Sequence, residues 1–435
     1  MTGGCSVSAA VDRGAKSIQP PFPSVPFAPK TSPMSFTFIH AADLHIDSPL
    51  ESLGAKDPAV AARFARAGRA AVEALVRETI ESEAKFLIIA GDVFDGDWKD
   101  VSTGLFFVRQ LGELLRAKIP VYIIKGNHDA DSQMSRALRY PENVHTFSAR
   151  GESRLIEPLR VALHGRSYAQ RAAPDDFVAS YPARREGFLN IGVLHTGLDG
   201  RPGHDPYAPC TVADLRRFGY DYWALGHIHA AEIVDRDPFV VYSGNVQGRS
   251  PRETGPKGFV RVTVDDGRIA AVEPVAIDAA RWAHESVDVS AAVDEPEALA
   301  LIAEALQRAH LQADGRPLAA RITLTGETPA HARLVAHREA LEAEARARGF
   351  EIGADCWVER LRVATQPPPP RALSAEPDGL DVEALIAAAA AEPEFAAVVA
   401  ELRRAVVEKL PTVLREELAL GDVAALARDF LAGER

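Results

Sequence analysis

Five short clusters of histidine, aspartate and asparagine stand out in this sequence, and each directly follows an apolar run. They are Asp43-Leu44-His45, Gly91-Asp92-Val93-Phe94-Asp95, Gly126-Asn127-His128-Asp129, His195 and Gly226-His227-Ile228-His229. Imidazole, carboxylate and amide oxygen without a thiolate form a ligand set typical of Mn²⁺, Fe²⁺ or Zn²⁺. The five clusters together offer more ligands than one ion needs. They favour two ions, bridged by one carboxylate, that clamp a phosphate group for in-line attack.

The apolar runs before these clusters are typical of β-strands, and amphipathic stretches lie between several of them. Strands are expected at 36–39, 86–89, 121–124, 191–194, 222–225, 239–242 and 259–264, and helices at 58–83 and 104–117. This alternation predicts an α/β sandwich around a central sheet. Ligand sites of such sheets gather at the carboxyl ends of strands, so the clusters can converge. On an extended segment Asp43 and His45 would point the same way, and so would His227 and His229.

The chain divides into five expected parts. Residues 1–35 are rich in Gly, Ser and Pro, and we expect either a disordered extension or a natural start at Met34. Residues 36–277 carry all five clusters. A small α/β domain is expected at 278–366, with strands near 285–289, 320–325 and 356–363 and helices at 295–310 and 330–348. A proline-rich linker (367–379) then leads to a helical tail (380–435).

Composition limits the function classes. The chain has 435 residues, of which 47% are hydrophobic and 25% charged, as in ordinary globular proteins. Three scattered cysteines are too few for a disulfide framework or a cysteine zinc site, which fits the cytoplasm. The sequence lacks an apolar run of about 18 residues, so no contact with a membrane is expected. The formal charge of −12 means that metal ions or a local basic patch must meet any polyanion.

One such patch follows the last cluster. Residues 249–258 contain three cations and one acid. We expect a phosphate-facing loop there, and the alternative is an ordinary solvated loop. The candidate substrate-binding residues in and beside it are Asn245, Gln247, Arg249, Arg252 and Lys257.

The order and spacing of the five clusters resemble the motifs of the calcineurin-like metallophosphoesterases. Three longer stretches resemble the SbcD-type DNA repair exonucleases, and among them the YhaO-like branch. These stretches are His40-Ala-Ala-Asp-Leu-His-Ile-Asp-Ser-Pro49, Tyr222-Trp-Ala-Leu-Gly-His-Ile-His229 and Gly244-Asn-Val-Gln-Gly-Arg249. The resemblance implies a metallophosphoesterase β-sandwich flanked by helices, with a small capping domain and partner-binding helices.

The resemblance also implies roles for the clustered residues. It assigns two divalent ions, Mn²⁺ first, with Mg²⁺, Fe²⁺ or Zn²⁺ as alternatives. One ion is assigned to Asp43, His45, Asp92 and His229, and the other to Asp92, Asn127, His195 and His227. His128 is implied as the catalytic histidine, and Asp129 as the residue that orients it. Many family members carry a histidine on the DNA side of the site where this chain has Asp95, so endonuclease activity is left open.

The implied function is a DNA exonuclease that hydrolyses phosphodiester bonds. The chain contains no Gly-x-x-x-x-Gly-Lys-Ser/Thr loop, and the family obtains energy from a separate coiled-coil ATPase of the SbcC type. The tail would dock to that ATPase, or alternatively pack on its own chain or form a homodimer. Two other functions stay open: a phosphatase or phosphodiesterase acting on small phosphoesters, and a non-catalytic DNA-end binder.

Overall fold

A computed structural model describes most of the chain. The described residues are 1, 35–48, 58–95, 101–131, 138–172, 177–198, 208–369 and 397. The expected N-terminal extension and helical tail lie outside the described residues, apart from three single positions, and so does the linker beyond residue 369.

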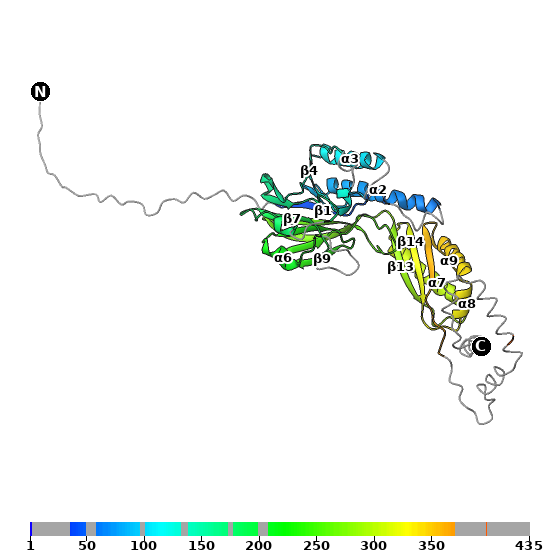
Figure 1. The fold of residues 1–435 in the computed structure, drawn as a ribbon. Coiled ribbons are helices and arrows are strands. Elements are labelled where there is room, and N and C mark those ends of the chain that lie inside the picture. The colour runs from blue at the N-terminus through cyan, green and yellow to red at the C-terminus, as the bar shows by residue number, and fades with distance from the viewer. Residues whose placement is uncertain are drawn as a thin grey trace.

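Two six-stranded sheets form the larger part of the structure (Figure 1). In spatial order, the first contains β12 (Arg268–Ala276), β11 (Gly258–Asp265), β1 (Phe36–Ala41), β2 (Leu87–Ala90), β3 (Val121–Ile124) and β4 (Val144–Thr146). The second contains β5 (Glu152–Ile156), β6 (Val161–Gly165), β7 (Leu189–His195), β8 (Tyr222–Gly226), β10 (Phe239–Tyr242) and β9 (Glu232–Arg236). One cluster of buried residues, including Phe38, Ile88, Tyr222 and Val241, draws on both sheets and forms the core between them.

Helices cover the outer faces of the two sheets. On the first sheet lie α2 (Pro58–Glu81) and α3 (Val101–Arg116), as Figure 1 shows. The second sheet carries the short helix α6 (Val212–Arg217). The buried positions Phe64, Ala67, Ala71 and Leu75 recur every three or four residues, which gives α2 one apolar face. The chain therefore has the mixed α/β architecture that the sequence predicts, with sheets flanked by helices.

A smaller α/β unit follows. Its elements are β13 (Arg281–Asp288), α7 (Glu295–Gln312), β14 (Leu318–Thr325), α8 (His331–Ala336), α9 (Arg338–Ile352) and β15 (Cys356–Val363). The three strands are parallel in the order β13-β14-β15, with α7 and α9 packed on the sheet. The helix expected at 330–348 is instead two helices that meet at His337.

The small unit is joined to the larger part by side-chain contacts. The Trp282 ring packs edge-on against Phe64 of α2, with centroids 5.3 Å apart. Trp282 Nε1 also donates to the carbonyl of Gly248 at 3.0 Å. Gln247 Oε1 accepts the backbone N–H of Ala279 at 2.8 Å. Residues 247–248 therefore connect directly to the start of the small unit.

The topology places the ends of five strands together. β1, β2 and β3 are mutually parallel, as are β7 and β8, and the two helix-covered sheets face one another. The remaining short helices are α4 (Asn127–Asp131) and the 3₁₀ turns Glu157–Leu159 and Val178–Ser180. Within the described residues, no helix has the length and apolarity that crossing a membrane requires.

Candidate metal centre

Backbone pairing beyond the strand ends sets the geometry of the centre. The N–H of Asp43 donates to the carbonyl of Gly91 at 3.0 Å, and that of His45 to the carbonyl of Asp92 at 3.1 Å. The backbone is left-handed at Asp43 (φ 52°), His45 (φ 39°), Asp92 (φ 54°) and His227 (φ 96°). Each such non-glycine residue costs about 1–2 kcal/mol. The extended geometry expected for Asp43 and His45 is therefore wrong, although both side chains still reach the centre.

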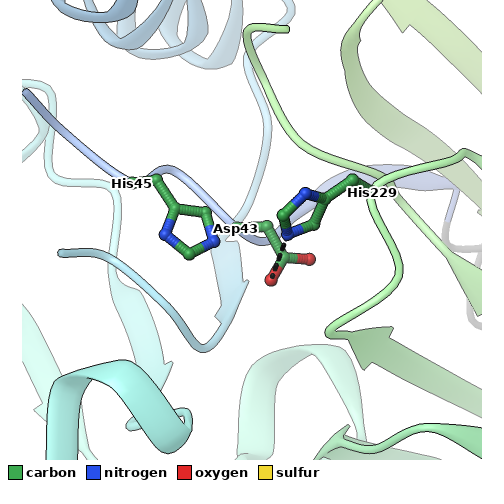
Figure 2. A group of neighbouring side chains, drawn as sticks. All are labelled: Asp43, His45 and His229. Atoms are coloured by element: carbon green, nitrogen blue, oxygen red, sulfur yellow. Dashed lines mark ion pairs between the residues drawn. The ribbon is translucent and has the colours of Figure 1, made fainter. Parts of the chain in front are cut away.

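One half of the centre consists of Asp43, His45 and His229, which Figure 2 shows turned toward one another. They offer ligand atoms that all lie within 4.8 Å of one another. His229 Nε2 is 3.9 Å from Asp43 Oδ1. Both ring nitrogens of His45 are buried and lack a hydrogen-bond partner among the described residues. Burial lowers the pKa of His45, which favours the neutral imidazole that a cation needs, so this donor set fits a divalent ion.

The other half contains His195, Asn127, Asp92 and His227. His195 Nδ1 lies 2.9 Å from the carbonyl of Ala90, and because a carbonyl accepts hydrogen bonds only, Nδ1 carries a hydrogen. His195 Nε2 then faces Asn127 Oδ1 at 3.0 Å and Asp92 Oδ2 at 3.3 Å. The ring centroids of His195 and His227 are 5.2 Å apart. His227 and His229, expected to face one site, thus lie in different halves of the centre.

Asp92 lies between the two halves. Its Oδ2 atom is 3.3 Å from His195 Nε2 and 3.8 Å from His45 Nε2, while Oδ1 accepts the backbone N–H of His128 at 3.0 Å. Burial would raise the pKa of Asp92, but the neighbouring histidines hold it well below its usual range. Gly126 permits this arrangement, because a Cβ atom there would lie 2.1 Å from Asp92 Oδ1. A carboxylate so placed can bridge two ions.

His128 is partly exposed at the edge of the centre. Its Nδ1 atom lies 3.0 Å from Asp95 Oδ1, and this hydrogen bond raises the pKa of His128. The expected partner, Asp129, instead accepts backbone N–H groups of Val93, Phe94 and Gly126 at 3.0–3.2 Å. Burial and the charge of Asp92 raise the pKa of Asp129 to about 6.

One expectation about these carboxylates is therefore corrected. Asp129 fixes the loops after β2 and β3 rather than the His128 ring. Asp95, which the sequence suggested as a change on the DNA side of the site, is the carboxylate that faces His128.

The loop after β10 contributes less to the centre than the sequence suggested. Arg249 reaches it, with Nη1 3.3 Å from Asp95 Oδ2. Gln247 is bound to the backbone of residues 279–280, and the Lys257 ammonium donates to the carbonyl of His229 at 2.8 Å. Asn245 Nδ2 donates to Glu253 and to the Gln247 carbonyl, and Arg252 is exposed. Gln247, Lys257 and Asn245 therefore have internal structural bonds, and Arg249 is the candidate residue of this loop that reaches the centre.

Sequence reasoning missed Glu253. Its Oε1 atom lies 2.8 Å from His229 Nδ1. Burial would raise the pKa of Glu253, but the hydrogen bond and charge of His229, together with Arg249, lower it to about 2. The available signal was that Glu253 is the only acid in the basic stretch 249–258.

Comparisons with known proteins show the family of this chain. A family model described as calcineurin-like phosphoesterase matches residues 36–231, and one described as the middle domain of metallophosphoesterase YhaO matches residues 282–366. The uncharacterized metallophosphoesterase YhaO of Bacillus subtilis (strain 168) is 36% identical over 298 residues, which cover 67% of this chain and 72% of that protein. The chain belongs to the calcineurin-like metallophosphoesterases.

Two solved structures show a more distant similarity. TT1561 of Thermus thermophilus is 11% identical, with a TM-score of 0.32, over 55% of this metallophosphoesterase and 99% of that chain. A dimetal phosphatase from Danio rerio is 14% identical, with a TM-score of 0.33, over 56% and 98% of the two chains.

Proposed function

We propose that this metallophosphoesterase is a cytoplasmic exonuclease that hydrolyses DNA phosphodiester bonds with two divalent ions, Mn²⁺ first. The observation that carries the two-ion proposal is the position of Asp92, whose Oδ2 faces His195 at 3.3 Å and His45 at 3.8 Å. The residues that would hold the ions are Asp43, His45, Asp92 and His229 on one side, and Asp92, Asn127, His195 and His227 on the other.

The residues around the centre divide the work of hydrolysis. When bound, the ions supply positive charge that polarises the phosphate and activates water. His128 is held by Asp95 through Nδ1, so its Nε2–H is the hydrogen that can be given to a phosphate oxygen or to the leaving oxygen. Arg249 bonds the same Asp95 and adds a fixed positive charge beside the centre. Asp129 accepts backbone N–H groups of Val93 and Gly126, and it thereby holds in place the two loops that carry Asp92 and His128.

DNA as the substrate is supported by the sequence resemblance of residues 40–49, 222–229 and 244–249 to the SbcD-type exonucleases. The charge distribution is compatible with this substrate. Because the chain has a net charge of −12, the metal ions and local cations such as Arg249 must supply the positive charge that binds an anionic polymer. A coiled-coil ATPase is the proposed partner, docked on the tail 380–435.

A single set of assays tests the substrate. Linear duplex DNA, single-stranded DNA, bis-p-nitrophenyl phosphate and p-nitrophenyl phosphate are each incubated with the full chain in Mn²⁺ or in chelator. We expect Mn²⁺-dependent release of nucleotides from DNA ends and cleavage of the phosphodiester. Activity confined to the monoester would instead identify a small-molecule phosphatase. DNA retention without cleavage of any substrate would identify an end binder.

The partner has its own test. A chain that ends at Gln366 keeps every proposed ligand, so we expect it to hydrolyse bis-p-nitrophenyl phosphate at the rate of the full chain. The same truncation should abolish association with the ATPase and ATP-stimulated digestion of long DNA. A truncated chain that still co-purifies with the ATPase would contradict the docking role of the tail.

A further inference from the structure

Glu253 contacts one of the proposed ligands, His229, and belongs to none of the groups of candidate metal ligands among the described residues. We propose that Glu253 is a positioning residue that orients the His229 ring toward its ion and holds Arg249 beside the centre. The proposal rests on the proposed function only in taking His229 as a ligand.

The Glu253 carboxylate is held in one orientation by several bonds. Its Oε1 atom is 2.8 Å from His229 Nδ1. Its Oε2 atom accepts the side-chain amide of Asn245 at 2.8 Å and the backbone N–H of Arg249 at 2.7 Å. The side chain is only 14% exposed, so these bonds are largely shielded from water. Because both oxygens are engaged, the position of Glu253 dictates where the His229 ring can lie.

The bond to Glu253 also selects the tautomer of His229. An ionised carboxylate accepts hydrogen bonds only, so the ring hydrogen of neutral His229 must be on Nδ1. The lone pair of Nε2 is then directed to the side of Asp43, whose Oδ1 atom is 3.9 Å away (Figure 2). A carboxylate behind a ligating histidine fixes the ring and increases its basicity, and its loss weakens metal binding by about 10–100-fold.

Glu253 also helps to place Arg249 beside the centre. Arg249 Nη2 lies 3.5 Å from Glu253 Oε1, and Arg249 Nη1 lies 3.3 Å from Asp95 Oδ2. The guanidinium is therefore held between a carboxylate that contacts His229 and one that contacts His128. Removal of the Glu253 charge should loosen Arg249 as well as His229.

The first experiment compares Glu253→Gln with the wild type and with a control, Glu186→Gln, in the full chain. Glutamine is nearly isosteric, but its amide NH₂ must face one of the donors on His229, Asn245 or Arg249. Glu186 is exposed and pairs with Arg184 at 3.5 Å, so its variant makes the same charge change away from the centre. Metal-free proteins are titrated with Mn²⁺ by calorimetry. We expect one of two binding steps to weaken about 10–100-fold in Glu253→Gln and neither to change in the control.

A double-mutant cycle separates positioning from a general structural role. If Glu253 acts through His229, then Glu253→Gln should change Mn²⁺ affinity less than about twofold in a His229→Ala background, because the group it orients is gone. Mn²⁺ binding at millimolar concentration is followed by electron paramagnetic resonance, which detects weak sites. The same loss in both backgrounds, or wild-type affinity in a folded Glu253→Gln protein, would overturn the proposal.

Folding is checked by circular dichroism and thermal unfolding for every variant. Glu253→Asp keeps the charge but shortens the side chain, and it should show a smaller loss of affinity than glutamine. If the glutamine variant does not fold, the Mn²⁺ affinity of Glu253→Asp tests the proposal instead. Wild-type affinity in Glu253→Asp would contradict the need for close contact between Glu253 and His229. Both titrations use Mn²⁺ alone, so they test Glu253 even if no phosphodiester is hydrolysed.

Discussion

The Asp95 carboxylate contacts two basic side chains, with Oδ1 3.0 Å from Nδ1 of His128 and Oδ2 3.3 Å from the guanidinium of Arg249, and its Oδ1 atom also lies 3.6 Å from Nδ1 of His45. Asp95 therefore holds a proton donor, His128, and a permanent positive charge, Arg249, at the exposed edge of the centre. Neither His128 nor Arg249 is among the proposed ligands, so their contribution can be separated from metal binding.

His128→Ala should leave both ions bound and lower turnover of bis-p-nitrophenyl phosphate by about 10²–10⁴, the usual contribution of a positioned acid or base. Metal content is measured by mass spectrometry on the same preparation. Asp95→Asn should reduce turnover less, because the ring is retained but less firmly held. A missing ion in His128→Ala would show that His128 is a ligand rather than an acid.

Removal of metal should abolish activity and lower thermal stability. Ions that bind the folded chain alone stabilise it by about 2.7 kcal/mol at a concentration 100-fold above the dissociation constant. We therefore expect the unfolding temperature of the chelator-treated protein to rise on addition of Mn²⁺, in step with activity. Asp92→Asn should show a much smaller rise, since it removes the charge shared by both halves. Full activity in chelator would refute the metal centre altogether.

Gly126→Ala should disrupt the centre without a change in any ligand. The new methyl group would lie 2.1 Å from Asp92 Oδ1, so the carboxylate must shift. We expect Mn²⁺ affinity to fall by about 10–100-fold, comparable to loss of an orienting contact. Gly68→Ala in α2 is the matched control, because a Cβ added there would meet no atom within 4 Å among the described residues outside its own helix backbone. It should keep wild-type affinity and add about 0.5–1 kcal/mol of stability.

The free energy of unfolding should depend on pH through His40. Its ring is fully buried and contacts the Tyr222 hydroxyl at 3.0 Å, and burial lowers its pKa from 6.5 to about 3. The unfolded chain therefore binds more protons between these values, so stability present above pH 6.5 is lost as the pH falls toward 3. Between pH 7 and pH 4 this group should account for about 3 kcal/mol.

Urea unfolding of the wild type and of His40→Gln across this pH range measures the effect. Glutamine cannot titrate, so the variant should lose less stability than the wild type as the pH falls, whatever its stability at pH 7. Parallel curves for the two proteins would show that His40 does not carry this dependence.

Local patterns in the sequence predicted the strands that precede the polar clusters and the side chains that converge, but they missed β4, β5, β6, β9 and β12. Apolar runs such as 36–39 and 222–225 are strands because their residues are buried on both faces. The polar clusters converge because parallel strands end at one edge. What local reasoning could not supply is the left-handed backbone at Asp43 and Asp92, since alternation rules assume an extended chain. It also could not pair Asp95 with His128, because that contact depends on how two separate loops approach.

The division of the helix expected at 330–348 illustrates the same limit. The stretch around His337 contains no proline or glycine, so nothing in the local sequence ends a helix there. In the structure His337 Nδ1 lies 2.6 Å from Glu295 Oε1 at the start of α7. This break accompanies a contact between distant segments, which periodicity does not encode.

The segment 245–253 is bonded at both ends to different parts of the molecule. Glu253 contacts His229 of the metal centre, whereas Gln247 and Gly248 are bonded to the start of the small unit. The contact between the two units is thus connected through this segment to a proposed ligand. Trp282 lies outside the two six-stranded sheets. We nevertheless expect a substitution at Trp282 to change the alignment of the His229 imidazole.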